Sequence, residues 1–565
     1  MKDVPARGRL SNVLPIAGWL PGCLTGGVRA DIVAGLALAG LLVPEGMAYA
    51  GIAGVPPQTG LYSAAVGLFV YALFGSSRQL AVSSTSGSAV MLAALVAPLA
   101  QGDAGRYLVL ASATAIAAGL LLLTGSLFKL GFVSEFISKP VLKGFVFGLA
   151  VTIMIKQAPK LLGIEQGHGD AIDRAWHILT SLPLTNLWTL AVGASALAVI
   201  FLLAAYVPRI PSALVVLVLG ILSVGWFNLE RHGVEIVGSI PTGLPVLGLP
   251  PVARNEMPNL FAGALGIVLI VYAEALAAAR TFAGKHNYDI NPNQELAALG
   301  AANVASGLSQ GMIVGGGMSG TAANDSGGAR TQLAAIVSSL AVLLTLLFLM
   351  PLFHNLPEAV LGAIVIHAVW HLADIKELRR FARLRTGSVW AALVALTGVL
   401  VLGPLPGLVL AMILTIIALM KRISAPQDSV LGHLPNTGNF ADIALHPDAE
   451  RIPGLLIFRP NGPMFFANAN RTHNRLRTLI SESTGALRAV ILNLEASPIS
   501  DVTTLDMLQQ LKNELDKAGV ELVFARVADP VHDLFRKGGL LACVGEDRVF
   551  PGVDSAVAFC CAKKA

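Results

Sequence analysis

Residues 311–330 read GMIVGGGMSGTAANDSGGAR and interrupt an otherwise apolar region of the chain. Glycine is so frequent in this run that neither a helix nor a lipid-facing strand can hold it throughout. In hydrocarbon every backbone N–H and C=O must be hydrogen-bonded within the protein, so such a break is tolerated only where protein or a water-filled cavity covers it. Membrane transporters bind solute at breaks of this kind. The run therefore predicts a half-membrane helix beside a solute site.

The segment before this break, FAGALGIVLIVYAEALAAARTF at residues 261–282, is apolar except for Glu274 near its middle. Small residues surround the acid, and small residues let neighbouring helices approach closely. We therefore expect Glu274 to lie close to the break at 315–321. Two interpretations remain open: a coupling-ion ligand or proton carrier, or a carboxylate that serine and backbone donors satisfy.

Composition predicts a membrane domain followed by a soluble one. The 565 residues are 55% hydrophobic and 13% charged, whereas an ordinary soluble protein has about 25% charged residues. Apolar runs of spanning length recur up to about residue 420, and soluble helix and strand patterns begin near residue 424. No nucleophile–base pair or metal cluster is visible, so we expect neither an enzyme nor a metal site.

Basic residues gather near the ends of the predicted spans, where they set orientation. They precede the first span at Lys2, Arg7, Arg9 and Arg29, and recur at 129–143, 280–285, 376–385 and 421–422. We predict that these ends are cytosolic. The clusters lack interleaved aromatic residues, so nucleic-acid binding is not expected. The leader has no cleavable signal pattern, and we expect the first span to be retained as an anchor.

The first predicted span, residues 30–50, contains Pro44, Glu45 and Gly46. Proline removes a backbone donor, so the helix is expected to be interrupted and to bend there. A lone carboxylate facing lipid is costly, which predicts that Glu45 points into the protein. The alternative is an inert glutamate bonded to a neighbouring helix.

A second break matches the first. The short alternation QLAVSS at 79–84 leads into TSGS at 85–88, and this resembles the order in which 312–316 leads into SGT at 319–321. One such element in each half is typical of an inverted repeat with discontinuous helices. Two helix starts facing each other would favour an anion between their N–H groups. Close helix packing is the other interpretation of these small residues.

The soluble region alternates strands and helices. Residues 455–459, 489–494 and 520–525 are predicted strands, and 469–481 and 504–518 are predicted helices. No nucleotide-binding glycine fingerprint or catalytic triad is present. We therefore expect binding or regulation from this domain.

Three runs carry a resemblance to a known family: LLVPEGMAYAGIAGVPPQTGLYSA in the first spans, NPNQELAALGAANVASGL before the break, and LEASPISDVTTLDML near the C-terminus. The chain resembles the SulP (sulfate permease) anion transporters with a C-terminal STAS domain. The resemblance implies a polytopic α-helical membrane protein of fourteen segments in two inverted repeats of seven, divided into core and gate, and a cytosolic α/β STAS domain. The expected boundaries are 1–29 (cytosolic segment), 30–422 (transport domain), 423–450 (linker) and 451–565 (STAS domain).

The resemblance also implies site residues. The anion is expected between the starts of the third and tenth segments, with the first segment closing the site; these residues are Thr85, Ser86, Gly87, Ser88, Ser319, Gly320, Thr321, Glu45 and Tyr49. Glu45 or Glu274 would carry the coupling proton, and Glu274 matches a sodium ligand of a bicarbonate-carrying branch. The chain departs from the pattern of this family at two positions. Gly320 stands where several relatives have arginine, and Ala278 stands where the sodium branch has a hydroxyl.

The predicted function is proton-coupled symport of sulfate, bicarbonate or a dicarboxylate by alternating access. The alternatives are a sodium-coupled bicarbonate symporter and an uncoupled anion exchanger or channel. No cofactor is expected beyond the coupling H+ or Na+. The expected partners are the anion, membrane lipid, a second copy of the chain in a homodimer, and a cytosolic regulator of the STAS domain. The expected location is the bacterial inner membrane, with the N-terminus and the STAS domain cytosolic.

Overall fold

The computed structural model describes residues 15–16, 28–132, 139–167, 169–207, 211–370, 372–384, 388–424, 428–435, 437–483 and 486–562. Within these residues the chain forms two compact units, one up to Thr415 and one from Ile416 onward. Most of the expected N-terminal segment 1–29 and part of the expected linker, residues 425–427 and 436, lie outside the described residues.

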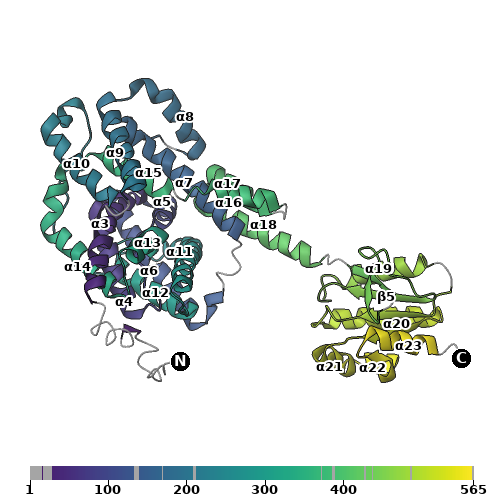
Figure 1. The fold of residues 1–565 in the computed structure, drawn as a ribbon. Coiled ribbons are helices and arrows are strands. Elements are labelled where there is room, and N and C mark those ends of the chain that lie inside the picture. Colours follow the sequence, from purple (N-terminus) through teal and green to yellow (C-terminus); the bar gives the residue numbers. More distant parts are fainter. Residues whose placement is uncertain are drawn as a thin grey trace. The chain divides into compact units, whose positions relative to one another are not determined.

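The membrane unit is a bundle of helices (Figure 1), and their order in the chain forms two sets of seven segments, each with a short strand before its third helix. The first seven segments are α3 (Val28–Ala53), α4 (Pro57–Phe74), α5 (Ser86–Ala100), α6 (Ala104–Leu127), α7 (Lys139–Leu162), α9 (Leu187–Tyr206) and α10 (Ser212–Phe227). The second seven are α11 (Met257–Lys285), α12 (Pro292–Leu308), α13 (Met318–Ser326), α14 (Leu333–Leu344), α15 (Glu358–Trp370), α17 (Ser388–Leu402) and α18 (Pro404–Ser424). This confirms the predicted inverted-repeat fold class.

Two shorter helices occupy matching places in the two repeats. Helix α8 (Ala171–Ser181) follows the fifth segment of the first repeat, and α16 (Ile375–Leu384) follows the fifth segment of the second. Neither helix was predicted from the sequence, where 376–385 was assigned only to a basic cluster, because neither stretch has the length or apolarity of a span.

Close helix contacts define a core and a gate. In the core, α6 packs on α12, and a β-carbon at Gly119 would lie 2.6 Å from the backbone nitrogen of Val304. In the gate, α7 packs on α17, and a β-carbon at Gly144 would lie 2.1 Å from the carbonyl oxygen of Ala392. Without a side chain at these points, backbones approach closely enough for strong dispersion contact in lipid. Helix α3 contacts core helices and also α10 and α15 of the gate.

The predicted interruption of the first span is wrong. Helix α3 is continuous from Val28 to Ala53 and passes through Pro44. Proline removes only one backbone donor, and close packing on α4 holds the helix at this point. A β-carbon at Gly60 of α4 would lie 2.0 Å from the carbonyl oxygen of Gly46. Tertiary contact therefore outweighs the local tendency to break.

The soluble unit is a six-stranded sheet covered by helices. The sheet order is β4-β3-β5-β6-β7-β8, with β5 to β8 parallel. The strands are β3 (Asp428–His433), β4 (Phe440–Asp442), β5 (Leu455–Pro460), β6 (Ala489–Asn493), β7 (Glu521–Ala525) and β8 (Val549–Phe550). The helices are α19 (Ala469–Ser481), α20 (Val502–Lys517), α21 (Asp529–Lys537), α22 (Leu540–Val544) and α23 (Val553–Ala562).

Both faces of this sheet are covered, so its central strands are mostly apolar. All residues of β6 are buried; Val490 and Leu492 face the cluster formed with α19 to α22, and Ile491 faces the cluster formed with α23. The predicted strands and helices at 455–525 are confirmed. The sequence analysis missed the strands β3, β4 and β8 and the helices α21 to α23.

Candidate functional site

The two breaks lie side by side at the centre of the core. Strand β1 (Val82–Ser83) pairs antiparallel with β2 (Gly315–Gly316), with Val82 opposite Gly316 and Ser83 opposite Gly315. Each strand leads directly into a helix start, β1 into α5 and β2 into α13. The pairing therefore places these two starts close together, although about 230 residues separate them in the sequence.

Side chains from α4 and α12 hold the unwound run before β2. Asn303, fully buried in α12, accepts from Val314 N at 3.0 Å and donates to Val314 O at 2.9 Å. Ser306 Oγ donates to Met312 O, and Ser63 Oγ accepts from Met312 N, both at 2.7 Å. These bonds give backbone N–H and C=O groups at membrane depth the hydrogen-bond partners that a helix or sheet would otherwise provide. The sequence analysis missed all three residues; polar side chains in apolar helices were the available signal.

The start of α5 has a capping box. Thr85 Oγ1 accepts from Ser88 N at 3.2 Å, and Ser88 Oγ accepts from Thr85 N at 3.0 Å. The hydroxyls of Thr85 and Ser88, two of the predicted site residues, therefore accept hydrogen bonds from backbone N–H groups at the start of the helix. Among the described residues, no acceptor is bonded to Ser86 N or Gly87 N. The donors that α5 can offer a ligand are thus the backbone N–H groups of Ser86 and Gly87, together with the Ser86 hydroxyl.

The start of α13 differs because no side chain caps it. Thr321 is fully buried, and its hydroxyl donates to Gly317 O at 2.6 Å and accepts from Ala81 N at 3.2 Å. Thr321 therefore joins α13 to the segment before β1 and does not offer its hydroxyl to a ligand. Within the described residues, the N–H groups of Met318, Ser319 and Gly320 have no acceptor, and Ser319 is exposed.

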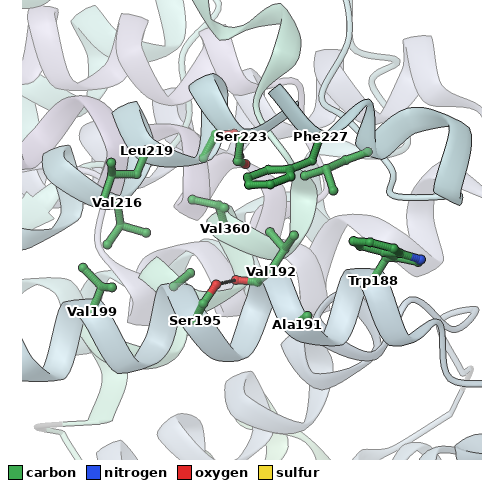
Figure 2. A pocket seen from close by; sticks show the side chains of 13 residues that line it. Trp188, Ala191, Val192, Ser195, Val199, Val216, Leu219, Ser223, Phe227 and Val360 are labelled. Atoms are coloured by element: carbon green, nitrogen blue, oxygen red, sulfur yellow. Dashed lines mark hydrogen bonds between the residues drawn. The ribbon is translucent and has the colours of Figure 1, made fainter. Parts of the chain in front are cut away.

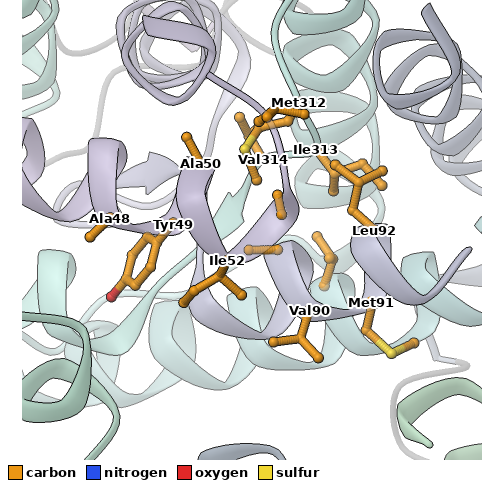
Figure 3. Close-up of a cluster of buried hydrophobic side chains, with 14 of the residues drawn as sticks. Ala48, Tyr49, Ala50, Ile52, Val90, Met91, Leu92, Met312, Ile313 and Val314 are labelled. Atoms are coloured by element: carbon orange, nitrogen blue, oxygen red, sulfur yellow. The ribbon is translucent and has the colours of Figure 1, made fainter. Parts of the chain in front are cut away.

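Glu45 and Tyr49 reach the same place from α3. Both are 5% exposed, and the Tyr49 hydroxyl lies near the Glu45 carboxylate and the Ser319 side chain. Figure 3 shows Tyr49 at the edge of an apolar cluster that includes Val90 and Met312, with its hydroxyl pointing away from those side chains. Glu45 and Tyr49 of the first segment therefore lie near the start of α13.

Glu274 approaches the start of α5. A β-carbon at Gly87 would lie 3.2 Å from Glu274 Oε1 and 3.4 Å from Oε2. Glu274 is partly accessible, and neither it nor Glu45 forms an ion pair among the residues that the structure describes. Ala278, one turn later on α11, is fully buried and has no hydroxyl. Glu274 is thus beside the helix start but lacks the second side-chain oxygen of a sodium site at this position.

The comparisons with known proteins identify the family. A family model described as "Sulfate permease family" matches residues 28–395. The chain belongs to the sulfate permease family. A second model, "STAS domain", matches residues 446–556. A relative named "Probable sulfate transporter" from Mycobacterium tuberculosis is 36% identical over 96% of this chain and 98% of its own length.

Other sulfate permease relatives and solved structures extend this result. "Sulfate transporter 1.3" of Arabidopsis thaliana is 30% identical over 98% of this chain and 88% of its own length. The fold matches murine solute carrier 26 family member A9, an anion transporter, with a TM-score of 0.92 at 23% identity, covering all of this chain and 96% of that one. The transmembrane domain of a cyanobacterium bicarbonate transporter, BicA, gives a TM-score of 0.60 over 69% of this chain and 96% of that one, at 24% identity.

Two hollows in this member of the sulfate permease family lie away from the paired helix starts. Figure 2 shows an apolar groove of about 400 Å³ between α9 and α10, lined by residues such as Val192, Leu219 and Val360. A second cavity of about 270 Å³ contains Lys160, whose Nζ lies 2.9 Å from Glu358 Oε2. The groove offers few polar groups and cannot replace the hydration shell of an anion. Among the described residues, no three His, Cys, Asp or Glu side chains could hold a metal ion.

Proposed function

We propose that this protein is a proton-coupled secondary active transporter of a small oxyanion, with sulfate as the first substrate to test. The observation that carries the proposal is the pairing of two helix starts with free N–H donors, next to two carboxylates without cationic partners. The sulfate-transporter names of the relatives support sulfate. Bicarbonate and dicarboxylates remain test substrates, because hydroxyl and backbone donors suit all three.

The anion would bind by backbone donors and helix polarity. Free N–H groups at Ser86 and Gly87 face the site from α5, and those at Met318, Ser319 and Gly320 from α13. Each helix start carries about half a positive charge, and two starts together favour an anion. Gly320 supplies no side chain; its β-carbon direction points toward Ala81 and Leu42.

Protons would be coupled to the anion through charge. An ionised Glu45 or Glu274 repels a bound anion, and this repulsion is strong where water is scarce. A proton on the carboxylate removes the repulsion and leaves the loaded site with less net charge. The core could then move against the gate at lower cost, because less charge has to be desolvated. Tyr49 would relay the protonation state of Glu45 to Ser319, since its hydroxyl lies near both side chains.

Two alternatives have specific predictions. A sodium-coupled bicarbonate symporter would use Glu274 as a sodium ligand, but Ala278 gives that site no hydroxyl. An uncoupled exchanger or channel would use the same helix starts, and its flux would not respond to an imposed proton gradient. Proton coupling is preferred because two carboxylates approach the site from α3 and α11.

The proposed setting is a homodimer in the bacterial inner membrane, with the STAS domain in the cytosol as a binding site for a regulator. Basic residues stand near the ends of several segments, as the positive-inside rule expects of cytosolic ends, and this supports the proposed orientation. Lys143 of α7 pairs with Asp374 after α15, and Lys285 of α11 pairs with Asp325 of α13.

Uptake into proteoliposomes tests the proposal. Labelled sulfate, bicarbonate and succinate are supplied separately, with an inward proton gradient, an inward sodium gradient, or neither. We expect sulfate to accumulate only when the outside is acidic. Accumulation driven by sodium alone would favour the sodium symporter, and equal flux under all three conditions would favour the uncoupled protein. Absence of uptake for all three anions would contradict small-anion transport.

A further inference from the structure

Helix α16 is held against the gate by one face. It lies between α15 and α17 in the chain and packs on α7 and α17. Phe381 is 8% exposed, so this side chain is buried in the contact, and Asp374 Oδ1 accepts from Glu377 N at 3.1 Å at the helix start. The helix is therefore a fixed part of the gate.

The opposite face of α16 is a basic stripe, defined here as Lys376, Arg379, Arg380 and Arg383. Positions at this spacing lie on one side of a helix, and all four side chains are exposed. Glu377 pairs with Arg380 at 3.1 Å. Among the described residues, no carboxylate pairs with Lys376, Arg379 or Arg383. The stripe therefore presents a positive surface with three uncompensated cations.

Two exposed tryptophans next to α16 indicate its position relative to the membrane surface. Trp370 at the end of α15 is 54% exposed, and Trp390 in the first turn of α17 is 73% exposed. Exposed tryptophans at the ends of spans are typical of the membrane–water interface. Ile375, 53% exposed, extends the apolar side of α16 at the same end. A basic amphipathic helix at this level lies in the headgroup region.

The matching helix of the first repeat has no such stripe. Helix α8 reads AIDRAWHILTS and contains one arginine and one aspartate. The internal repeat therefore explains why a short helix follows the fifth segment in each half. It does not explain the positive charge of α16. The basic stripe is therefore a property of α16 that α8 does not share.

We infer that the basic stripe of α16 binds the phosphate headgroups of anionic phospholipids in the adjacent leaflet, which is the cytosolic leaflet in the proposed orientation. Headgroup oxygens would pair with Lys376, Arg379 and Arg383, and the acyl chains would lie beside Ile375 and the two tryptophans. Charge complementarity favours this occupant, since the stripe faces the layer where lipid phosphates lie. The bound lipids would fix the gate in the membrane while the core moves.

Lipid binding by the purified full-length protein tests this inference without any transport. Native mass spectrometry measures the affinity for phosphatidylglycerol, with phosphatidylcholine as the neutral comparison. The variant K376Q/R379Q/R383Q should lose about a hundredfold in affinity for phosphatidylglycerol, because each basic residue near an anionic surface contributes roughly a factor of five. Binding of phosphatidylcholine should not change.

Two control variants show whether a change in lipid affinity comes from the charge of the basic stripe. K376R/R379K/R383K conserves the charge and should bind phosphatidylglycerol within about threefold of the unmodified protein. R471Q/K517Q/K537Q removes three exposed positive charges from the soluble unit and should have no effect. If the triple glutamine variant unfolds, the single change Arg379→Gln is expected to weaken binding about fivefold.

Three results would overturn the inference. One is unchanged affinity for phosphatidylglycerol in a folded K376Q/R379Q/R383Q variant. Another is competition by inorganic phosphate at millimolar concentration, which would make the stripe a site for free phosphate. The third is a changed oligomeric state with unchanged lipid affinity, which would assign the stripe to a second copy of the chain. Binding is measured without substrate, so a failed transport proposal would leave this test intact.

Discussion

The carboxylate of Glu274 lies against Gly87 at the first turn of α5. A β-carbon at position 87 would lie 3.2 Å from Glu274 Oε1, which is closer than ordinary van der Waals contact. A glycine at this point lets the acid of α11 approach the free N–H donors of a helix start. An anion entering the same place must therefore share it with this carboxylate, and that relation is the basis of the coupling proposal.

Replacing Gly87 with alanine should disturb this contact. The added methyl group must push the carboxylate or the helix start by a few tenths of an ångström. We expect anion uptake to fall about tenfold, since about 1.4 kcal/mol corresponds to a factor of ten. Initial uptake rates in proteoliposomes measure the loss. Gly225→Ala is the control, because its β-carbon would meet nothing within 4 Å; equal rates for both variants would show that the contact is unimportant.

Replacing Glu45 with glutamine should uncouple transport from protons. Glutamine has a similar shape but carries no titratable charge. We expect Glu45→Gln to abolish proton-driven accumulation and to retain part of the exchange of internal for external anion. The two activities are measured on the same proteoliposomes, with and without an inward proton gradient. A variant that still concentrates substrate would move the coupling role away from Glu45, and Glu274→Gln would then be the next variant to test.

Asn303 is predicted to be required for the stability of the unwound run. Asn303→Leu leaves Val314 N and Val314 O without their partners. Each buried group left unsatisfied costs about 1–3 kcal/mol, so the variant should melt at clearly lower temperature in detergent. Thr397→Ala is the control, because that exposed hydroxyl bonds only to its own helix. Equal melting temperatures would contradict the role of Asn303.

Asp501 should make the start of α20 sensitive to acid. Although burial acts to raise its pKa, the backbone N–H groups of Thr504 and Phe466 donate to the carboxylate and lower the pKa of Asp501 overall. The folded state thus prefers the ionised form. Its contribution is complete above the unfolded pKa of about 3.9 and is lost as pH falls through the lower folded value.

Hydrogen exchange in α20 measures this effect in the full-length protein. Asp501→Ala should lower local stability by about 1 kcal/mol at neutral pH, as expected for loss of an N-cap. The unmodified protein should approach the variant as the pH is lowered below about 4. Asp506→Ala changes an exposed acid of the same helix that has no side-chain hydrogen bond or ion pair among the described residues, and it serves as the control. Protection that is the same in all three proteins would rule out the capping role.

Much of the candidate site could be predicted from local sequence. The glycine-rich run at 311–330 cannot continue as a regular helix, and the TSGS run at 85–88 has the residues of a helix start. Glu45 and Glu274 are acids in apolar spans, where lipid exposure is costly. These are properties of short stretches, so they can be read without knowing the fold.

The roles of particular atoms could not be read in this way. Thr85, Ser88 and Thr321 were predicted to belong to the anion site, and the structure shows their hydroxyls engaged in helix capping and in the link between α13 and the segment before β1. Asn303 and Ser63 support the break from distant parts of the chain. Partners of this kind depend on which helices become neighbours, and sequence spacing does not specify that.

The sequence by itself determined a membrane unit with two interrupted helices and a soluble α/β unit, because apolar length, glycine breaks and strand–helix alternation are local consequences of solvation and backbone sterics. Only the tertiary structure decided that β1 pairs with β2, that α3 stays helical through Pro44, and that Glu274 lies on Gly87. Each of these depends on close contact between segments far apart in the chain, where packing outweighs local preference.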